Sequence, residues 1–173
     1  MILRDFKLND CNHFIALQNN GLFTKSIYLV ITINDIIVGF ELNNKVSLEN
    51  STRLGNLFAD IELAQQRGDE KNPYSYIKKT ALKEIEKTNV FSKEVFQINK
   101  NNFKIDKIHI EKIIFIGIEN KKYINTGDIV IETKIETKNH PNPNLRVPKR
   151  KLTLLGVQDY AKILAYFNDS QLG

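Results

Sequence analysis

The fold is predicted by two runs of sequence, Ile113-Ile114-Phe115-Ile116-Gly117-Ile118 and Asp128-Ile129-Val130-Ile131-Glu132-Thr133-Lys134-Ile135-Glu136-Thr137. The first run is almost wholly apolar. The second alternates apolar and polar residues, which is the period of a strand with one buried and one solvated face. We therefore predict an antiparallel hairpin over residues 108–137 at the centre of a sheet, closed either through 119–122 or through 125–127.

A second hairpin is predicted nearer the start of the chain, over residues 27–42. Two runs rich in β-branched and aromatic residues, 27–33 and 36–42, flank Asn34 and Asp35. Both turn residues tolerate positive φ, so two of them can connect adjacent antiparallel strands. The chain should thus contain at least two hairpins.

Helices are predicted where apolar residues recur three or four positions apart next to capping residues. Asp10 resembles an N-cap before Phe14, Ile15 and Leu17, and Pro73 suits the first position of a later helix. The predicted helices span residues 10–19, 52–67, 73–88 and 157–168. The whole pattern indicates a single α+β domain over residues 1–173, with a mostly antiparallel sheet packed against these helices.

Composition indicates the structural class of the protein but says little about its function. The chain has 173 residues, of which 42% are hydrophobic and 26% charged, and a formal net charge of +5. These values are typical of one globular domain, and the modest positive charge favours an anionic partner without identifying it. No apolar run approaches the roughly 20 residues of a membrane span, and the single Cys11 suits a reducing compartment, so we expect a soluble cytoplasmic protein that does not bind membranes.

One charged pattern resembles a nuclease site. Asp128, Glu132 and Lys134 fall on one face of the predicted strand, and Mg²⁺-dependent nucleases use carboxylates and a lysine in comparable spacing. An ordinary solvated strand face with alternating charges has the same pattern. We treat these three residues as an alternative catalytic set and the solvated face as the leading interpretation.

Other catalytic and metal-binding patterns are weaker. Cys11 and His13 could form a nucleophile and base, but residues two apart on the predicted helix point in different directions. The histidines at 13, 109 and 140 lack the spacing of zinc ligands. The sequence also contains no glycine-rich phosphate-binding loop and no Gly-x-Ser-x-Gly motif of a hydrolase nucleophile. We therefore predict neither a metal site nor a cofactor.

Residues 138–151 differ abruptly in composition from their surroundings. This segment has three prolines, is basic at both ends, and is predicted to be a loop. Its candidate partner-binding residues are His140, Arg146, Lys149, Arg150 and Lys151. If they act at the surface, replacing Arg146, Lys149 and Arg150 by alanine should weaken binding while leaving thermal stability nearly unchanged.

The sequence thus favours a non-catalytic interaction protein that binds a macromolecular partner, most simply another protein. A small intracellular inhibitor, such as a toxin-immunity protein or an antitoxin, is one form of this hypothesis. The alternative is a nucleic-acid-binding protein or Mg²⁺-dependent nuclease that uses the segment 138–151 and the charged strand face 128–138.

Overall fold

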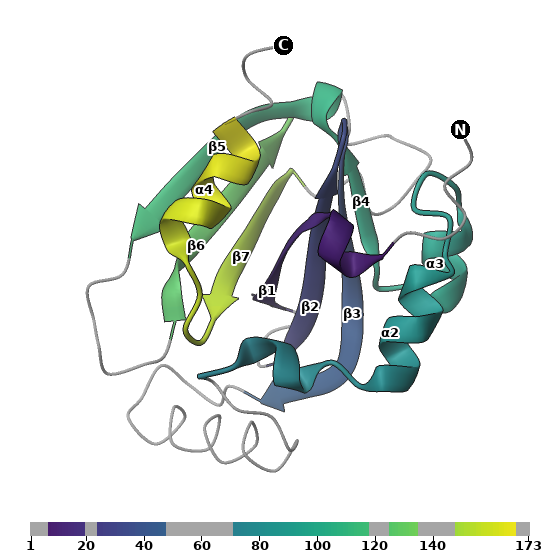
Figure 1. Ribbon diagram of the computed structural model, residues 1–173. Coiled ribbons are helices and arrows are strands. Elements are labelled where there is room, and N and C mark those ends of the chain that lie inside the picture. Colours follow the sequence, from purple (N-terminus) through teal and green to yellow (C-terminus); the bar gives the residue numbers. More distant parts are fainter. Residues whose placement is uncertain (1–6, 20–23, 48–70, 118–124, 135–147, 169–173) are drawn as a thin grey trace.

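The computed structural model describes residues 7–19, 24–47, 71–117, 125–134 and 148–168. This part of the chain forms a seven-stranded antiparallel sheet in the order β4-β3-β2-β1-β7-β6-β5 (Figure 1). The strands are β1 Asn12–Asn19, β2 Thr24–Ile33, β3 Ile36–Ser47, β4 Phe103–Asp106, β5 Ile110–Gly117, β6 Asn125–Thr133 and β7 Lys149–Leu155. The helices are η1 Leu8–Asp10, η2 Pro73–Tyr76, α2 Lys79–Glu86, α3 Glu94–Ile98, η3 Lys107–His109 and α4 Tyr160–Asn168. The predicted α+β class is confirmed in this coarse form, with most of the structure in the sheet.

The sheet has an apolar cluster on each face. Ile15 and Leu29 belong to one cluster with residues of η2, α2 and α3, whereas Phe14 and Val30 belong to the other with Ile163 and Phe167 of α4. In Figure 1, α4 lies across β5 to β7, and α2 and α3 lie beside β3 and β4. The central strands are therefore apolar on both faces because both faces are covered.

The sheet is strongly curved. β4 and β7 are separated by β3, β2 and β1, so in a flat sheet they would be about 19 Å apart at the usual strand spacing. The Arg150 guanidinium carbon on β7 nevertheless lies 4.1 Å from the centre of the Phe103 ring on β4. The face covered by α4 is therefore concave, and side chains from distant strands meet inside it.

The predicted helix over residues 10–19 is wrong, because β1 occupies residues 12–19. Phe14 and Ile15 are both fully buried, and they belong to the clusters on opposite faces of the sheet. A strand covered on both faces has an unbroken apolar run, which residue spacing alone does not distinguish from a buried helix segment. Asp10 belongs to the short helix η1 instead.

The two predicted hairpins are confirmed as antiparallel pairs, β2 with β3 and β5 with β6. Asn34 has φ 47°, which is the conformation expected of its turn. The second hairpin is not central, however, because β5 is the last of the strands that the structure describes in this sheet. β6 begins at Asn125, so the turn cannot pass through 125–127, and the alternative at 119–122 lies outside the described residues.

The predicted helices later in the chain have three outcomes. The span 73–88 is divided into η2 and α2, because Ile77 and Lys78 have extended backbone between them. The span 157–168 is confirmed from Tyr160 onward as α4. The span 52–67 lies outside the described residues. Within those described residues, no helix is both long and apolar enough to cross a membrane.

Candidate functional site

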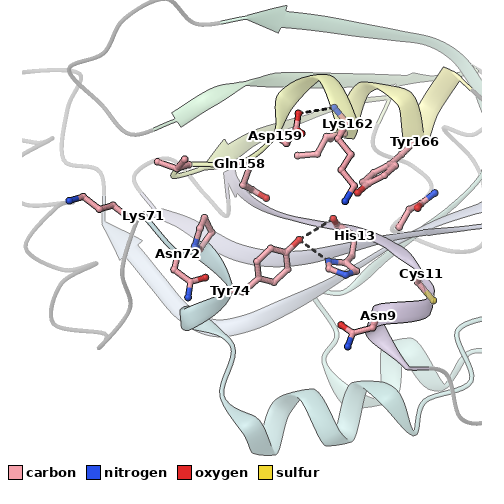
Figure 2. A pocket seen from close by; sticks show the side chains of 14 residues that line it. Asn9, Cys11, His13, Lys71, Asn72, Tyr74, Gln158, Asp159, Lys162 and Tyr166 are labelled. Carbon is pink, nitrogen blue, oxygen red and sulfur yellow. Dashed lines mark hydrogen bonds between the residues drawn. The ribbon is translucent and has the colours of Figure 1, made fainter.

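A pocket of about 470 Å³ lies where β1, η2 and α4 meet, and we call it the His13 pocket (Figure 2). It exists because β1 pairs with β7 only through Ala16 and Leu17. Beyond that point, the Gln158 side chain replaces β7: its Oε1 accepts from Ile15 N at 2.9 Å and its Nε2 donates to Ile15 O at 2.7 Å. At Asn12 and His13, β1 therefore pairs with β2 on one side and borders the pocket on the other.

His13 is held in one tautomer by Tyr74 of η2. The Tyr74 hydroxyl donates to the His13 carbonyl oxygen at 3.0 Å, and His13 Nδ1 lies 2.7 Å from the same hydroxyl oxygen. A phenol has one proton to donate, so the tautomer that satisfies both contacts carries the ring hydrogen on Nδ1 and donates it to Tyr74. Nε2 is then a hydrogen-bond acceptor, and no hydrogen bond reaches it from the residues that the structure describes.

The surroundings keep both rings neutral. Burial lowers the pKa of His13, and the positive charge of Lys162 on α4 lowers it further. Burial likewise raises the pKa of Tyr74, with a smaller contribution from Tyr166. At neutral pH, the pocket therefore presents an uncharged imidazole beside a lysine ammonium.

The lowered pKa of His13 predicts how stability changes with pH. Between the unfolded value of about 6.5 and the lower folded value, the unfolded chain binds a proton that folded His13 does not. The free energy of unfolding should therefore fall as the pH drops through this window. The His13 ring signals in an NMR titration should have a midpoint below 6.5. A midpoint above that value would contradict the burial of the imidazole, and His13→Gln should remove this part of the pH dependence.

Cys11 also lines the pocket, close in sequence to His13. His13 lies on a strand, so helix geometry does not separate it from Cys11. Burial and the nearby Asp10 carboxylate both raise the pKa of the Cys11 thiol, however. A nucleophilic cysteine needs a lowered pKa, so this environment favours an unreactive thiol.

The residues of the alternative nuclease set lie in and just after β6. Asp128 accepts a hydrogen bond from Thr153 at 2.6 Å and pairs with Lys151 at 3.1 Å. Glu132 pairs with Lys149 at 3.5 Å, whereas Lys134 is exposed beyond the end of the strand. Each carboxylate thus has its own cation on β7, and the described residues contain no cluster of three or more metal-ligating side chains.

The predicted basic segment, residues 138–151, is not a single loop, because its last residues are in a strand. Lys149, Arg150 and Lys151 belong to β7, while His140 and Arg146 lie outside the described residues. Lys149 and Lys151 have exposed side chains. Arg150 points to the concave face, is 5% exposed, and donates to Gln18 Oε1 at 2.7 Å. Its guanidinium is therefore enclosed in the core and not presented at the surface.

Sequence reasoning missed Tyr74, Gln158 and Lys162, which shape the His13 pocket. Tyr74 is 61 residues from His13, and Gln158 is 143 residues from Ile15, so no local pattern links them. One useful signal was present: if residues 12–19 are read as a strand, His13 and Ile15 share a face. That interpretation would have placed His13 beside other core residues.

No model of a protein family, no curated protein and no solved structure matches the chain.

Proposed function

We propose that this chain is a non-catalytic interaction protein that binds an acidic protein partner by accepting one of the partner's strands along β5. The observation that carries the proposal is the position and composition of β5. Among the strands that the structure describes, it lies at the end of the sheet, it is largely apolar, and one of its side chains is a half-exposed isoleucine.

β5 has few of the features that protect sheet edges. A bulge lies at its start, between Ile110 and Lys112, and from Lys112 to Gly117 it pairs with β6 in unbroken register. Proteins usually protect an edge with charges, prolines or bulges along its length. From Ile113 to Gly117 this strand has none of the three, and Ile116 is 47% exposed. Main-chain groups on such an edge can hydrogen-bond to an extended segment of another protein.

The charge beside this edge favours an acidic partner. The register aligns three rows of side chains on the face opposite α4: Lys112-Glu132-Lys149, Ile114-Val130-Lys151 and Ile116-Asp128-Thr153. These rows contain three lysines and two carboxylates, and each carboxylate already pairs with a lysine of β7. A partner strand with apolar side chains opposite Ile114 and Ile116, and an acidic one opposite Lys112, would match both features.

The narrower form of the proposal is an inhibitor of another protein, such as a toxin-immunity protein or an antitoxin. The same strand edge supports this form, because a protein that pairs with a partner's strand can block the partner's activity. Among the described residues, the nucleic-acid alternative has less support, because Arg150 is buried and lysines pair with the carboxylates of the nuclease pattern. His140 and Arg146 lie outside those residues.

The test compares two matched substitutions, Ile116→Lys on β5 and Phe91→Lys between α2 and α3. The two side chains are similarly exposed, at 47% and 40%. A lysine on an edge strand opposes strand addition, because its ammonium would be buried by the incoming partner. Affinity purification of the tagged chain from the cells that make it should recover a partner with wild type and Phe91→Lys, and about ten-fold less with Ile116→Lys.

Melting temperatures of both variants serve as the control for folding. Equal recovery by all three chains, or no partner with wild type, would contradict the proposal. Light scattering on the purified chain distinguishes a further outcome. A dimer that Ile116→Lys dissociates would mean that the strand bound by β5 comes from a second copy, and not from a different protein.

A further inference from the structure

We propose that the His13 pocket binds the phosphate group of a small molecule, with Lys162 supplying the positive charge and His13 Nε2 accepting a hydrogen bond from a phosphate hydroxyl. This site is separate from the β5 edge and does not depend on the function proposed for that edge.

The pocket favours an anion. Lys162 and Lys71 line it, and among the described residues of the lining Asp159 is the one carboxylate. Asp159 Oδ1 accepts from the Lys162 backbone N–H at 3.1 Å, so this carboxylate caps the start of α4. In the described part of the chain, no carboxylate pairs with the Lys162 ammonium. Figure 2 shows the Lys162 side chain extending from α4 toward His13 and Tyr166.

Three asparagines add neutral hydrogen-bond donors to the positive charge of the pocket. Asn9 of η1, Asn12 at the start of β1 and Asn72 just before η2 line the same pocket. Amides donate to phosphate oxygens without adding charge. The cationic group and the amides together therefore suit an oxyanion with several acceptor oxygens.

His13 makes the pocket selective among oxyanions. Its Nδ1 hydrogen is donated to Tyr74, so Nε2 offers a lone pair to whatever enters. A phosphate or phosphate monoester near neutral pH retains a hydroxyl proton on part of the population and can donate it to this nitrogen. Sulfate has the same shape but no proton, and its oxygens would face the lone pair unfavourably.

The size of the pocket favours a phosphate ester over the inorganic ion. A volume of about 470 Å³ lies within the roughly 300–1,000 Å³ typical of small-molecule sites and exceeds what one phosphate fills. Tyr166 and Ile163 supply an apolar part of the lining that could cover the organic portion. Inorganic phosphate is therefore a minimal probe of the site.

The experiment titrates the full chain with sodium phosphate, sodium sulfate and sodium acetate at pH 7.0 and constant ionic strength, by calorimetry and by NMR of the His13 ring. We expect phosphate to bind about ten-fold more tightly than sulfate, since only phosphate can donate a hydrogen bond to His13 Nε2. Acetate, which has neither the proton nor the third oxygen, should bind more weakly than phosphate. The His13 ring signals should move on addition of phosphate.

Two variants separate the two parts of the proposal. Lys162→Gln should weaken both phosphate and sulfate binding by about ten-fold, because it removes the ammonium. His13→Gln should abolish the preference for phosphate over sulfate, because an amide side chain can donate as well as accept. Lys149→Gln removes a comparable charge from β7 and should change neither.

Several results would overturn the site. They are equal affinity for phosphate and sulfate in the wild type, phosphate binding unaffected by Lys162→Gln, and phosphate binding that leaves the His13 signals in place. Ile116→Lys should retain full phosphate binding. A variant that loses partner recovery but keeps phosphate binding would show that the two sites are independent. A variant that keeps partner recovery but loses phosphate binding would show the same.

Discussion

Replacing Gly39 by alanine is expected to lower the free energy of unfolding by about 3 kcal/mol, roughly 10 °C in melting temperature for a chain of this length. Gly39 on β3 lies directly opposite Phe103 on β4. A Cβ atom at Gly39 would lie 2.1 Å from Phe103 Cε1 and 2.4 Å from Cζ. The ring therefore lies across the space that a side chain would fill, and overpacking displaces it.

Chemical denaturation of Gly39→Ala, Gly117→Ala and Phe103→Leu provides the measurement. Gly117 is the matched control, since its Cβ would meet only Tyr160 Cε1 at 3.9 Å, an ordinary contact. Its substitution should change stability by about 0.5 kcal/mol or less. The double variant Gly39→Ala, Phe103→Leu should be less destabilised than the sum of the single variants. An unperturbed Gly39→Ala would mean that the ring does not cover this glycine.

Arg150→Ala is expected to destabilise the protein by a similar amount, about 3 kcal/mol. The substitution removes a hydrogen bond to Gln18 at 2.7 Å and the contact of the guanidinium with the Phe103 ring at 4.1 Å. Burial lowers the pKa of Arg150 to about 10, so the group remains charged at neutral pH. Arg150→Lys should not restore stability, because an ammonium lacks the flat guanidinium that stacks on the ring.

The neighbouring Lys149→Ala is the control for Arg150. Its side chain is 62% exposed and pairs with Glu132 at the surface, where such a pair contributes little. It should therefore change the free energy of unfolding by no more than about 0.5 kcal/mol. Equal, small shifts for both variants would mean that Arg150 reaches solvent as the sequence suggested.

This pair of variants also revises the expectation for the basic segment. The sequence predicts that Lys149 and Arg150 lie at the surface and that their loss leaves thermal stability nearly unchanged. The strand alternation of β7 places Lys149 and Lys151 on one face and Arg150 on the other, within the core. A triple alanine variant containing Arg150 would therefore confuse a loss of binding with a loss of stability, and partner-binding tests should use Lys149 and Lys151 alone.

The buried polar groups around Arg150 could not be foreseen from sequence. Ser26 donates to Glu41 Oε1 at 3.0 Å on the same concave face, and both residues are buried. Burial raises the pKa of Tyr28, Glu41 raises it further, and Arg150 acts in the opposite direction. These residues come from β2, β3 and β7, so their proximity depends on the order and curvature of the strands.

Local pattern was sufficient where each element depends on its own residues. Alternation and turn residues predicted both hairpins, and the spacing of apolar residues predicted α4, because hydrogen bonding and burial within a short segment fix these elements. The spacing of apolar residues gave a wrong prediction for residues 10–19. This strand is buried on both faces, so its sequence lacks the alternation that distinguishes a strand from a helix.

The sequence by itself determined the α+β class, the hairpins and the last helix, since these follow from interactions between residues near one another in the chain. Only the tertiary structure decided that β5 is an edge, that Arg150 is enclosed, and that His13 meets Tyr74 and Lys162. Those facts depend on which strands become neighbours and how far the sheet curves. Such properties arise from packing the whole chain around two cores, and no single segment encodes them.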